Sequence, residues 1–271
     1  MYAVAVVGEE STTLTERLVS RLSRSGPVAA VSALPENPAP GFEEVVGFRA
    51  EGAGSVVGLG PGESTVHGRA RSLDEALDDL TPEHEYCLID GVADPRLPTI
   101  VAGEAADPAG DVVATVGRAD RADLDDLAAA IEGTEPRETL ESLVARVKRS
   151  PDAERSGAIA TFTGRVRAKD GADDARTELL EFEKYEGVAE ERMDAISREL
   201  TEREGVFAVR MHHRTGVIHD GEDIVFVVVL AGHREEAFRT VEDGINRLKD
   251  EVPIFKKEVT VEEEFWVHDR Q

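Results

Sequence analysis

The chain has 271 residues, of which 31 are basic and 56 are acidic, so its formal net charge is -25. A surface this acidic excludes a nucleic-acid partner bound through its phosphates, because such binding requires basic side chains. No apolar run reaches the roughly 18 residues of a membrane-spanning helix, and the first residues show no basic segment of a signal peptide. The single cysteine, Cys87, excludes an internal disulfide and a cysteine-based metal cluster. We therefore expect a cytoplasmic protein with neither a membrane nor a nucleic-acid partner.

Lysine is scarce in this chain, which has six lysines against 25 arginines. Excess acid with little lysine is typical of proteins that stay soluble at high salt, where ions screen the self-repulsion of the surface. An ordinary acidic protein from a GC-rich genome is the alternative. Three of the six lysines, Lys249, Lys256 and Lys257, fall within nine residues. This clustering of a scarce residue type indicates a functional segment.

Charge and turn residues divide the chain into two expected domains. Residues 1–134 carry nine basic and 24 acidic side chains, whereas residues 135–271 carry 22 and 32. Between them, Gly133-Thr134-Glu135-Pro136 has the composition of a break.

The first domain, 1–134, is expected to have an α/β fold. Short apolar runs that end in turn residues are typical of buried parallel strands. Such runs occur at residues 2–7, 27–32, 86–89, 97–102 and 112–116. Leucines at helical spacing predict a helix over residues 14–22, with its cap within 11–13, and residues 124–131 form a closing helix.

The start of this domain has the outline of a P-loop, with a strand, Gly8 and then Ser11-Thr12-Thr13. A P-loop needs G-x-x-x-x-G-K-[ST], in which the lysine and backbone N–H groups hold the phosphates. The second glycine and the lysine are missing, and Glu9 and Glu10 would repel phosphates. We therefore predict a degenerate P-loop-like domain that does not bind GTP tightly.

The second domain, 135–271, has mixed patterning in which strands outnumber helices, so an α+β fold is expected. Expected strands lie at residues 158–162, 179–182, 206–211, 224–230 and 254–261. Expected amphipathic helices lie at residues 140–147, 189–200 and 235–250. The run 224–230 is wholly apolar, so we expect a central strand buried on both faces. His219 is expected in a turn region.

Two short motifs place cations where an anion could bind. In TFTGRVR, residues 161–167, a strand that ends at a glycine turn would place Arg165 and Arg167 on one side of a sheet edge, where they suit a phosphate or carboxylate. In Gly232-His233-Arg234, a helix start offers backbone N–H groups and its dipole. The alternative for the first motif is a loop with two solvated arginines. The alternative for the second is a helix start with exposed polar residues.

The lysine cluster lies in LKDEVPIFKKE, residues 248–258. Lys249 ends a helix, where the dipole favours a cation whatever its function. Lys256 and Lys257 are adjacent on a strand, so their side chains point to opposite faces and at most one can share a site with Lys249. A lysine beside other cations and partly withdrawn from water has a lowered pKa and can act as a nucleophile or general base.

The histidines and the cysteine do not predict a metal centre. His212 and His213 are neighbours on a strand and point apart, without the carboxylates or spacing of a metal site. Cys87 lies inside an apolar run and is expected to be a small buried hydrophobic residue. Neither a metal nor a cofactor is expected.

Six stretches of the second domain occur in the order and spacing of one known family. They are GAIATFTGRVR (157–167), LEFEKYEG (180–187), HHRTGVIHDGEDIVFVVV (212–229), GHREEAF (232–238), NRLKDEVPIFKKE (246–258) and FWVHDR (265–270). Residues from about 140 to 270 thus resemble the large, catalytic subunit of molybdopterin synthase. The resemblance implies an α/β hammerhead with an added antiparallel sheet.

The resemblance also implies a sulfurtransferase. That family inserts two sulfur atoms into precursor Z, a cyclic pyranopterin monophosphate, to form the dithiolene of molybdopterin. The sulfur arrives as a thiocarboxylate on the C-terminal Gly-Gly of a small ubiquitin-like subunit. The large subunit forms a homodimer with one small subunit at each end, a heterotetramer. The implied catalytic residues are Lys249 and Lys256, and the implied substrate-binding residues are Phe162, Arg167, His233, Arg234 and Arg270, the last of them reaching across the dimer interface.

The first domain has a resemblance of its own. The opening of the chain and residues 86–91 resemble the GTP-binding adaptor of molybdopterin-guanine-dinucleotide synthesis. For the whole chain, two alternatives to a synthase with a single activity remain open. One is a non-catalytic scaffold that docks the small subunit or a later enzyme of the pathway, and the other is a bifunctional protein whose first domain binds GTP.

Overall fold

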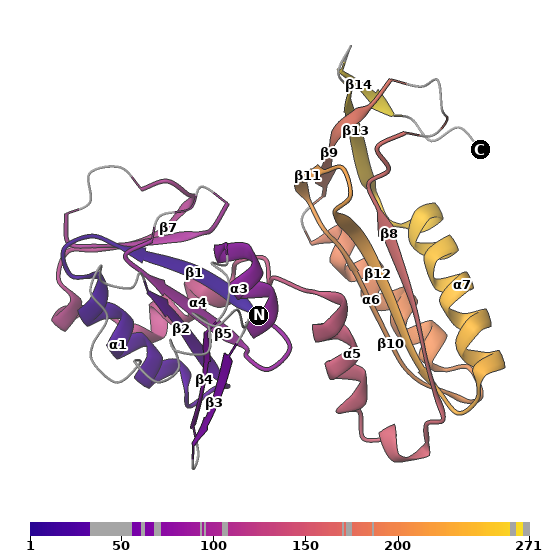
Figure 1. The fold of residues 1–271 in the computed structure, drawn as a ribbon, viewed down its shortest axis with the longest axis horizontal. Helices are drawn as coiled ribbons and strands as arrows, with labels where there is room; N and C mark the ends of the chain where they lie inside the picture. The colour runs from indigo at the N-terminus through magenta and orange to yellow at the C-terminus, as the bar shows by residue number, and fades with distance from the viewer. Residues whose placement is uncertain are drawn as a thin grey trace. The chain divides into compact units, whose positions relative to one another are not determined.

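The computed structural model describes residues 1–32, 56–60, 63–67, 72–92, 94, 96–104, 108–169, 171, 175–185, 187–260 and 264–267. The chain forms two compact units, Met1–Arg137 and Glu138–Gln271 (Figure 1). Each unit has hydrophobic clusters of its own. Among the described residues, no helix combines the length and the apolar composition that crossing a bilayer requires.

The first unit contains a five-stranded, fully parallel sheet in the order β2-β5-β1-β6-β7. Its strands are β1 (Tyr2–Val7), β2 (Val28–Ser32), β5 (Tyr86–Asp90), β6 (Thr99–Ala102) and β7 (Val112–Val116). A separate antiparallel pair consists of β3 (Val56–Gly60) and β4 (Glu63–His67). The parallel sheet confirms the α/β fold expected for this part of the chain.

Helices cover both faces of the parallel sheet. They are α1 (Ser11–Leu22), α3 (Leu73–Leu80) and α4 (Leu124–Glu132), with the short 3-10 helix η1 (Ala119–Arg121). Val4 and Val6 of β1 pack into a cluster with α1 and α4, whereas Ala3 and Ala5 pack into one with α3. Strands buried on both faces read as continuous apolar runs, which is why the pattern predicted them.

The cap of α1 differs from the expectation. The helix begins at Ser11, its N-cap residue is Glu10, and no side chain caps it. The carboxylate of Glu10 instead accepts a hydrogen bond from the Ala119 backbone N–H of η1, and the Thr12 hydroxyl donates to Asp90 at 2.8 Å. The expected cap within residues 11–13 is therefore wrong, because these residues already belong to the first turn of the helix, and the Thr12 hydroxyl bonds to β5 rather than to its own helix.

The second unit contains two antiparallel sheets, in the orders β10-β12-β8 and β11-β9-β13-β14. Its strands are β8 (Ala158–Arg165), β9 (Thr177–Lys184), β10 (Val206–His213), β11 (Gly216–His219), β12 (Asp223–Ala231), β13 (Ile254–Thr260) and β14 (Glu264–Val267). Together with its helices, this arrangement confirms the expected α+β fold. His219, expected in a turn, is instead the last residue of β11.

The helices of the second unit sandwich the central strand β12. They are α5 (Leu140–Lys148), α6 (Val188–Thr201) and α7 (Arg234–Glu251), with the short 3-10 helix η2 (Ala153–Arg155). Val227 and Val229 of β12 pack with α6 and α7, whereas Phe226 and Val228 pack with α5. The expectation of a central strand buried on both faces is confirmed.

Candidate active site

Phe162 lies on β8, one of the two edge strands of the three-stranded sheet, directly opposite Val227 of β12. Its partly buried ring packs against a core cluster that contains Leu248, near the end of α7. Ile254, at the start of β13, packs against the same cluster. Helix α7 runs antiparallel to β12, the strand that precedes it (Figure 1), and β12 is antiparallel to β8. The last turn of α7 therefore lies beside the C-terminal half of β8. Phe162 thus lies at the end of the unit where α7 ends and β13 begins.

The two arginines of the TFTGRVR motif have different surroundings. Arg165 is the last residue of β8 and forms an ion pair with Asp223 across the sheet, at 2.9 Å. It also donates to the backbone carbonyl of Gly221. Arg167 lies two residues beyond the strand, and its side chain is exposed. Val166, between the two arginines, is buried, whereas both arginines are exposed. Arg165 already pairs with an anion of its own chain, Asp223.

His233 and Arg234 open α7. His233 is the N-cap residue, without a side-chain capping bond, and both side chains are exposed. Glu235 and Glu236 occupy the first turn. These carboxylates satisfy the helix dipole themselves, so any anion bound here depends more on the two side chains than on the dipole.

The lysine cluster lies on both sides of the junction between α7 and β13. Lys249 is exposed in the last turn of the helix. Lys256 is partly buried and lies opposite Phe182 of β9, whereas Lys257 lies opposite Glu181, with its Nζ 3.9 Å from the Glu181 carboxylate. Neighbouring residues on a strand face opposite sides. The expectation that the two adjacent lysines point apart is confirmed by this register.

The candidate residues form two groups at opposite ends of α7. His233 precedes Lys249 by 16 residues, which at the helical rise corresponds to about 24 Å. Phe162 and Lys256 belong to the Lys249 end, where α7 meets β13 (Figure 1). One chain therefore does not bring His233 and Arg234 to its own lysines. Arg270 lies outside the described residues.

Lys184 is a further cation at the lysine end that the sequence patterns did not single out. It lies on β9 opposite Ile254. Phe182 is two residues away on the same strand, so Lys184 and Phe182 face the same side of the sheet. Its side chain is only 9% exposed and pairs with the Glu190 carboxylate at the start of α6. Burial alone would raise the pKa of Glu190, but the hydrogen bond and charge of Lys184 outweigh it and hold that pKa below its ordinary value. The sequence offers one signal for Lys184, because it is one of only six lysines and lies in a segment with a strand-like pattern.

The loop after β1 in the first unit has its backbone N–H groups already engaged. Those of Glu9, Glu10 and Ser11 donate to the carbonyls of Glu104, Ala102 and Gly8, at 3.3, 3.1 and 3.1 Å. Gly8 has a φ of 111°, and a side chain there would lie 2.2 Å from the Ala102 carbonyl oxygen. The loop is therefore pressed against β6, and these three N–H groups do not point to a phosphate.

Comparison with known proteins identifies the family. Residues 134–251 match the family model described as the MoaE protein. The whole chain is 55% identical over 271 residues to a probable molybdopterin synthase of Haloferax volcanii, and the match covers 100% of both proteins. It is also 38% identical over 114 residues to a molybdopterin synthase catalytic subunit of Yersinia pestis, covering 42% of this chain and 74% of that protein.

The N-terminal region is similar to the solved structure of MobB from Bacillus subtilis, with a TM-score of 0.36 and 18% identity over 49% of this chain and 99% of that one. For the second unit, the family named from its motifs is confirmed. Because the similarity to the Haloferax protein extends over the full length, the chain belongs to the family of molybdopterin synthase catalytic subunits, which act in molybdenum cofactor biosynthesis.

Proposed function

We propose that the chain transfers sulfur from the thiocarboxylated C-terminal Gly-Gly of a small ubiquitin-like subunit to precursor Z, forming the dithiolene of molybdopterin. The observation that carries this proposal is the placement of Lys249 and Lys256 on either side of the α7–β13 junction, at the end of α7 where Phe162 packs against the cluster that contains Leu248. Two of the six lysines of an acid-rich chain thus lie in one small region.

The charges of this region suit both reactants. The carrier terminus and the phosphate of precursor Z are anions, and lysine and arginine side chains are their natural partners. Each transfer breaks the bond between sulfur and the acyl carbon of the carrier and forms a carbon–sulfur bond on the pterin. The sulfur replaces an oxygen there, so a carbon–oxygen bond of the pterin breaks, and the displaced oxygen leaves as water or stays on the phosphate. Water takes the place of sulfur on the carrier, which leaves as a carboxylate. Two sulfur atoms therefore consume two charged carriers.

The two lysines would act at the acyl carbon. A neutral lysine amine can attack that carbon or remove a proton from the incoming group, and an ammonium can return a proton as a bond breaks. Phe162 would line the site with an apolar wall, and Arg167, at the same end of β8, would hold an anionic group of the substrate. Precursor Z and the carrier tail need to meet within reach of both lysines.

A homodimer would account for the separation of His233 and Arg234 from the lysines along α7. His233 and Arg234 lie about 24 Å from the lysine of their own chain, so they can join a lysine site only from a second copy. In a two-fold dimer, each copy would give its helix start to the lysines of the other. We assign Arg270 to the same cross-dimer role, and one small subunit to each end of the dimer.

Reconstitution tests the proposal. The full chain is mixed with precursor Z and a carrier whose C-terminus is a thiocarboxylate, and molybdopterin is measured by its fluorescent oxidation product. The matched control uses the same carrier as a plain carboxylate. Product that depends on the thiocarboxylate supports the proposal. No product, with the carrier bound, would favour the non-catalytic scaffold instead.

A further inference from the structure

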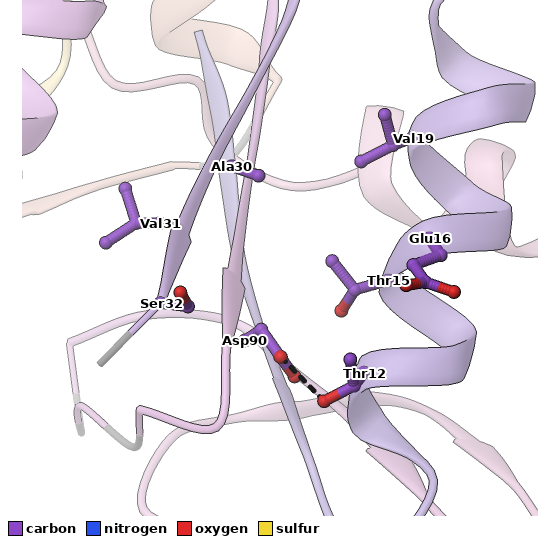
Figure 2. Close-up of a pocket in the computed structure, with 8 residues that line it drawn as sticks. All are labelled: Thr12, Thr15, Glu16, Val19, Ala30, Val31, Ser32 and Asp90. Atoms are coloured by element: carbon purple, nitrogen blue, oxygen red, sulfur yellow. Dashed lines mark hydrogen bonds between the residues drawn. The ribbon is translucent and has the colours of Figure 1, made fainter. Parts of the chain in front are cut away.

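A pocket of about 340 Å³ lies in the first unit, between α1 and the strands β2 and β5. Figure 2 shows Thr15 and Val19 of α1 facing Ala30 of β2 and Asp90 at the end of β5. The volume is at the lower end of the roughly 300–1,000 Å³ typical of small-ligand sites. The residues that line the pocket belong to the first unit, whereas the candidate sulfur-transfer residues all belong to the second.

Two buried polar atoms in the pocket have no hydrogen-bond partner. Thr15 is only 6% exposed, and its Oγ1 is unpartnered, although a threonine inside a helix commonly bonds the carbonyl four residues earlier. Oδ1 of Asp90 is also buried and unpartnered, whereas Oδ2 accepts the Thr12 hydroxyl at 2.8 Å (Figure 2). A buried acceptor without a donor costs stability, so both atoms favour a ligand that carries hydrogen-bond donors.

The charge of the pocket selects a cation. Asp90 and Glu16 contribute two carboxylates, and none of the described residues that line the pocket is basic. An anion would be repelled. The side chains of Val19 and Ala30 add aliphatic walls, which favour a flat and weakly hydrated cation over a compact, strongly hydrated ammonium.

We propose that this pocket binds a planar cationic group of the guanidinium or amidinium class. One N–H of the group donates to Asp90 Oδ1 and a second donates to Thr15 Oγ1, while Glu16 adds a second negative charge. A divalent metal ion is less suited, because the described residues contain no cluster of three or more metal-ligating side chains and Mg²⁺ demands near-octahedral oxygen coordination.

Binding of benzamidine to the full chain, in molar KCl, tests the proposal. The methyl groups of Val19 and Ala30 are observed by NMR during a titration. We expect saturable shifts of both methyls, with affinity reduced at least tenfold in Asp90→Asn. Glu83→Gln removes one exposed carboxylate before β5, at the far end of that strand from Asp90, and should leave the affinity unchanged.

A second variant guards against misfolding of Asp90→Asn. Thr15→Val keeps the shape of the side chain and removes only the unpartnered hydroxyl, so it should stay folded and still bind benzamidine more weakly. Absent methyl shifts, or equal affinity in Thr15→Val and wild type, would overturn the proposal. Displacement of benzamidine by Mg²⁺ at equimolar concentration would overturn it in favour of a metal site.

Two further probes distinguish the sources of such a group. Agmatine represents a free metabolite, and the blocked tripeptide acetyl-Gly-Arg-Gly-amide represents an arginine on a partner protein. Stronger binding of agmatine would assign the pocket to a small molecule, and stronger binding of the tripeptide would assign it to a protein arginine. Either result supports the site, whereas binding of neither probe at concentrations that saturate with benzamidine would contradict the guanidinium assignment.

Discussion

Lys256 of β13 lies directly opposite Phe182 of β9 across an antiparallel ladder. Phe182 is 6% exposed and meets the ring of His213 edge-on, with 4.9 Å between ring centroids. Residues opposite each other in a ladder share a face of the sheet. Lys256 therefore belongs to the face that packs on the interior of the unit, whereas Lys257 faces the other way, toward Glu181.

This register predicts different outcomes for two neighbouring substitutions. Lys256→Ala should reduce sulfur transfer by orders of magnitude, because it removes a proposed catalytic amine. Lys257→Ala is the matched control and should keep near-wild-type activity, because its side chain lies on the face of Glu181. Its stability should fall by at most about 1 kcal/mol, the usual contribution of an ion pair in contact with solvent. Initial rates with a pre-charged carrier provide the measurement. If Lys257→Ala were the inactive variant, the assignment of faces to the two lysines would be wrong.

The separation of His233 from Lys249 along α7 predicts complementation between two inactive variants. His233→Ala and Lys249→Ala should each be nearly inactive as pure proteins. After unfolding and refolding as an equal mixture, half of the two-fold dimers combine both variants and regain one of two sites, so about a quarter of wild-type activity should return. An inactive mixture that contains mixed dimers would contradict a site shared between copies.

Glu138, at the start of the second unit, predicts a pH-dependent contribution to stability. Its side chain accepts from the Ser142 hydroxyl at 2.7 Å and pairs with Arg146. Burial alone would raise the pKa of Glu138, but the Ser142 hydrogen bond and the Arg146 charge outweigh it and leave the pKa below its ordinary value. A lowered carboxyl pKa stabilises the fold above the unfolded pKa of about 4.3, and this contribution is lost as the pH falls through the folded value.

Glu138→Gln should remove that dependence. At neutral pH, we expect the free energy of unfolding to fall by about 1–3 kcal/mol, the usual cost of disturbing a buried polar pair. Below the folded pKa the variant and the wild type should converge. Denaturant titrations of both proteins across the acid range measure the difference. A constant difference between them at every pH would contradict the ionised role of Glu138.

The first unit should not bind GTP tightly. The N–H groups of Glu9, Glu10 and Ser11 are engaged by backbone carbonyls, and Glu9 and Glu10 add negative charge where a P-loop holds phosphates. Calorimetry with GTP and Mg²⁺ should show no binding at micromolar concentrations. A micromolar dissociation constant would establish the bifunctional alternative.

Much of the fold follows from local patterns, and the exceptions have physical causes. The apolar run of β12 predicted a strand buried on both faces, because each face packs on helices. In contrast, β11 has four residues and is ordered by pairing with β9, far away in the sequence, so no local pattern marks it. The apolar patterns did not predict helix α3, although the Ser72 and Glu75 of its capping box are visible in the sequence.

The site was predictable as a set of residues but less so as an arrangement. Residue types and motif spacing identified Lys249 and Lys256, whereas their distance from His233 depends on the uninterrupted length of α7, 18 residues. Lys184 was not identified as a candidate site residue, because its ion pair with Glu190 connects a strand to a helix outside that strand's own segment. Such contacts depend on tertiary packing, which short-range periodicity does not encode.

The most direct measurement of sulfur transfer follows the sulfur atom itself. The carrier is charged with a radioactive thiocarboxylate sulfur and incubated with precursor Z and either wild type, Lys249→Ala or Lys249→Arg. We predict labelled molybdopterin with wild type and none with either variant, because a guanidinium stays protonated and replaces neither a base nor a nucleophile. Unlabelled product with wild type, or full labelling with Lys249→Ala, would contradict the proposed transfer at this lysine.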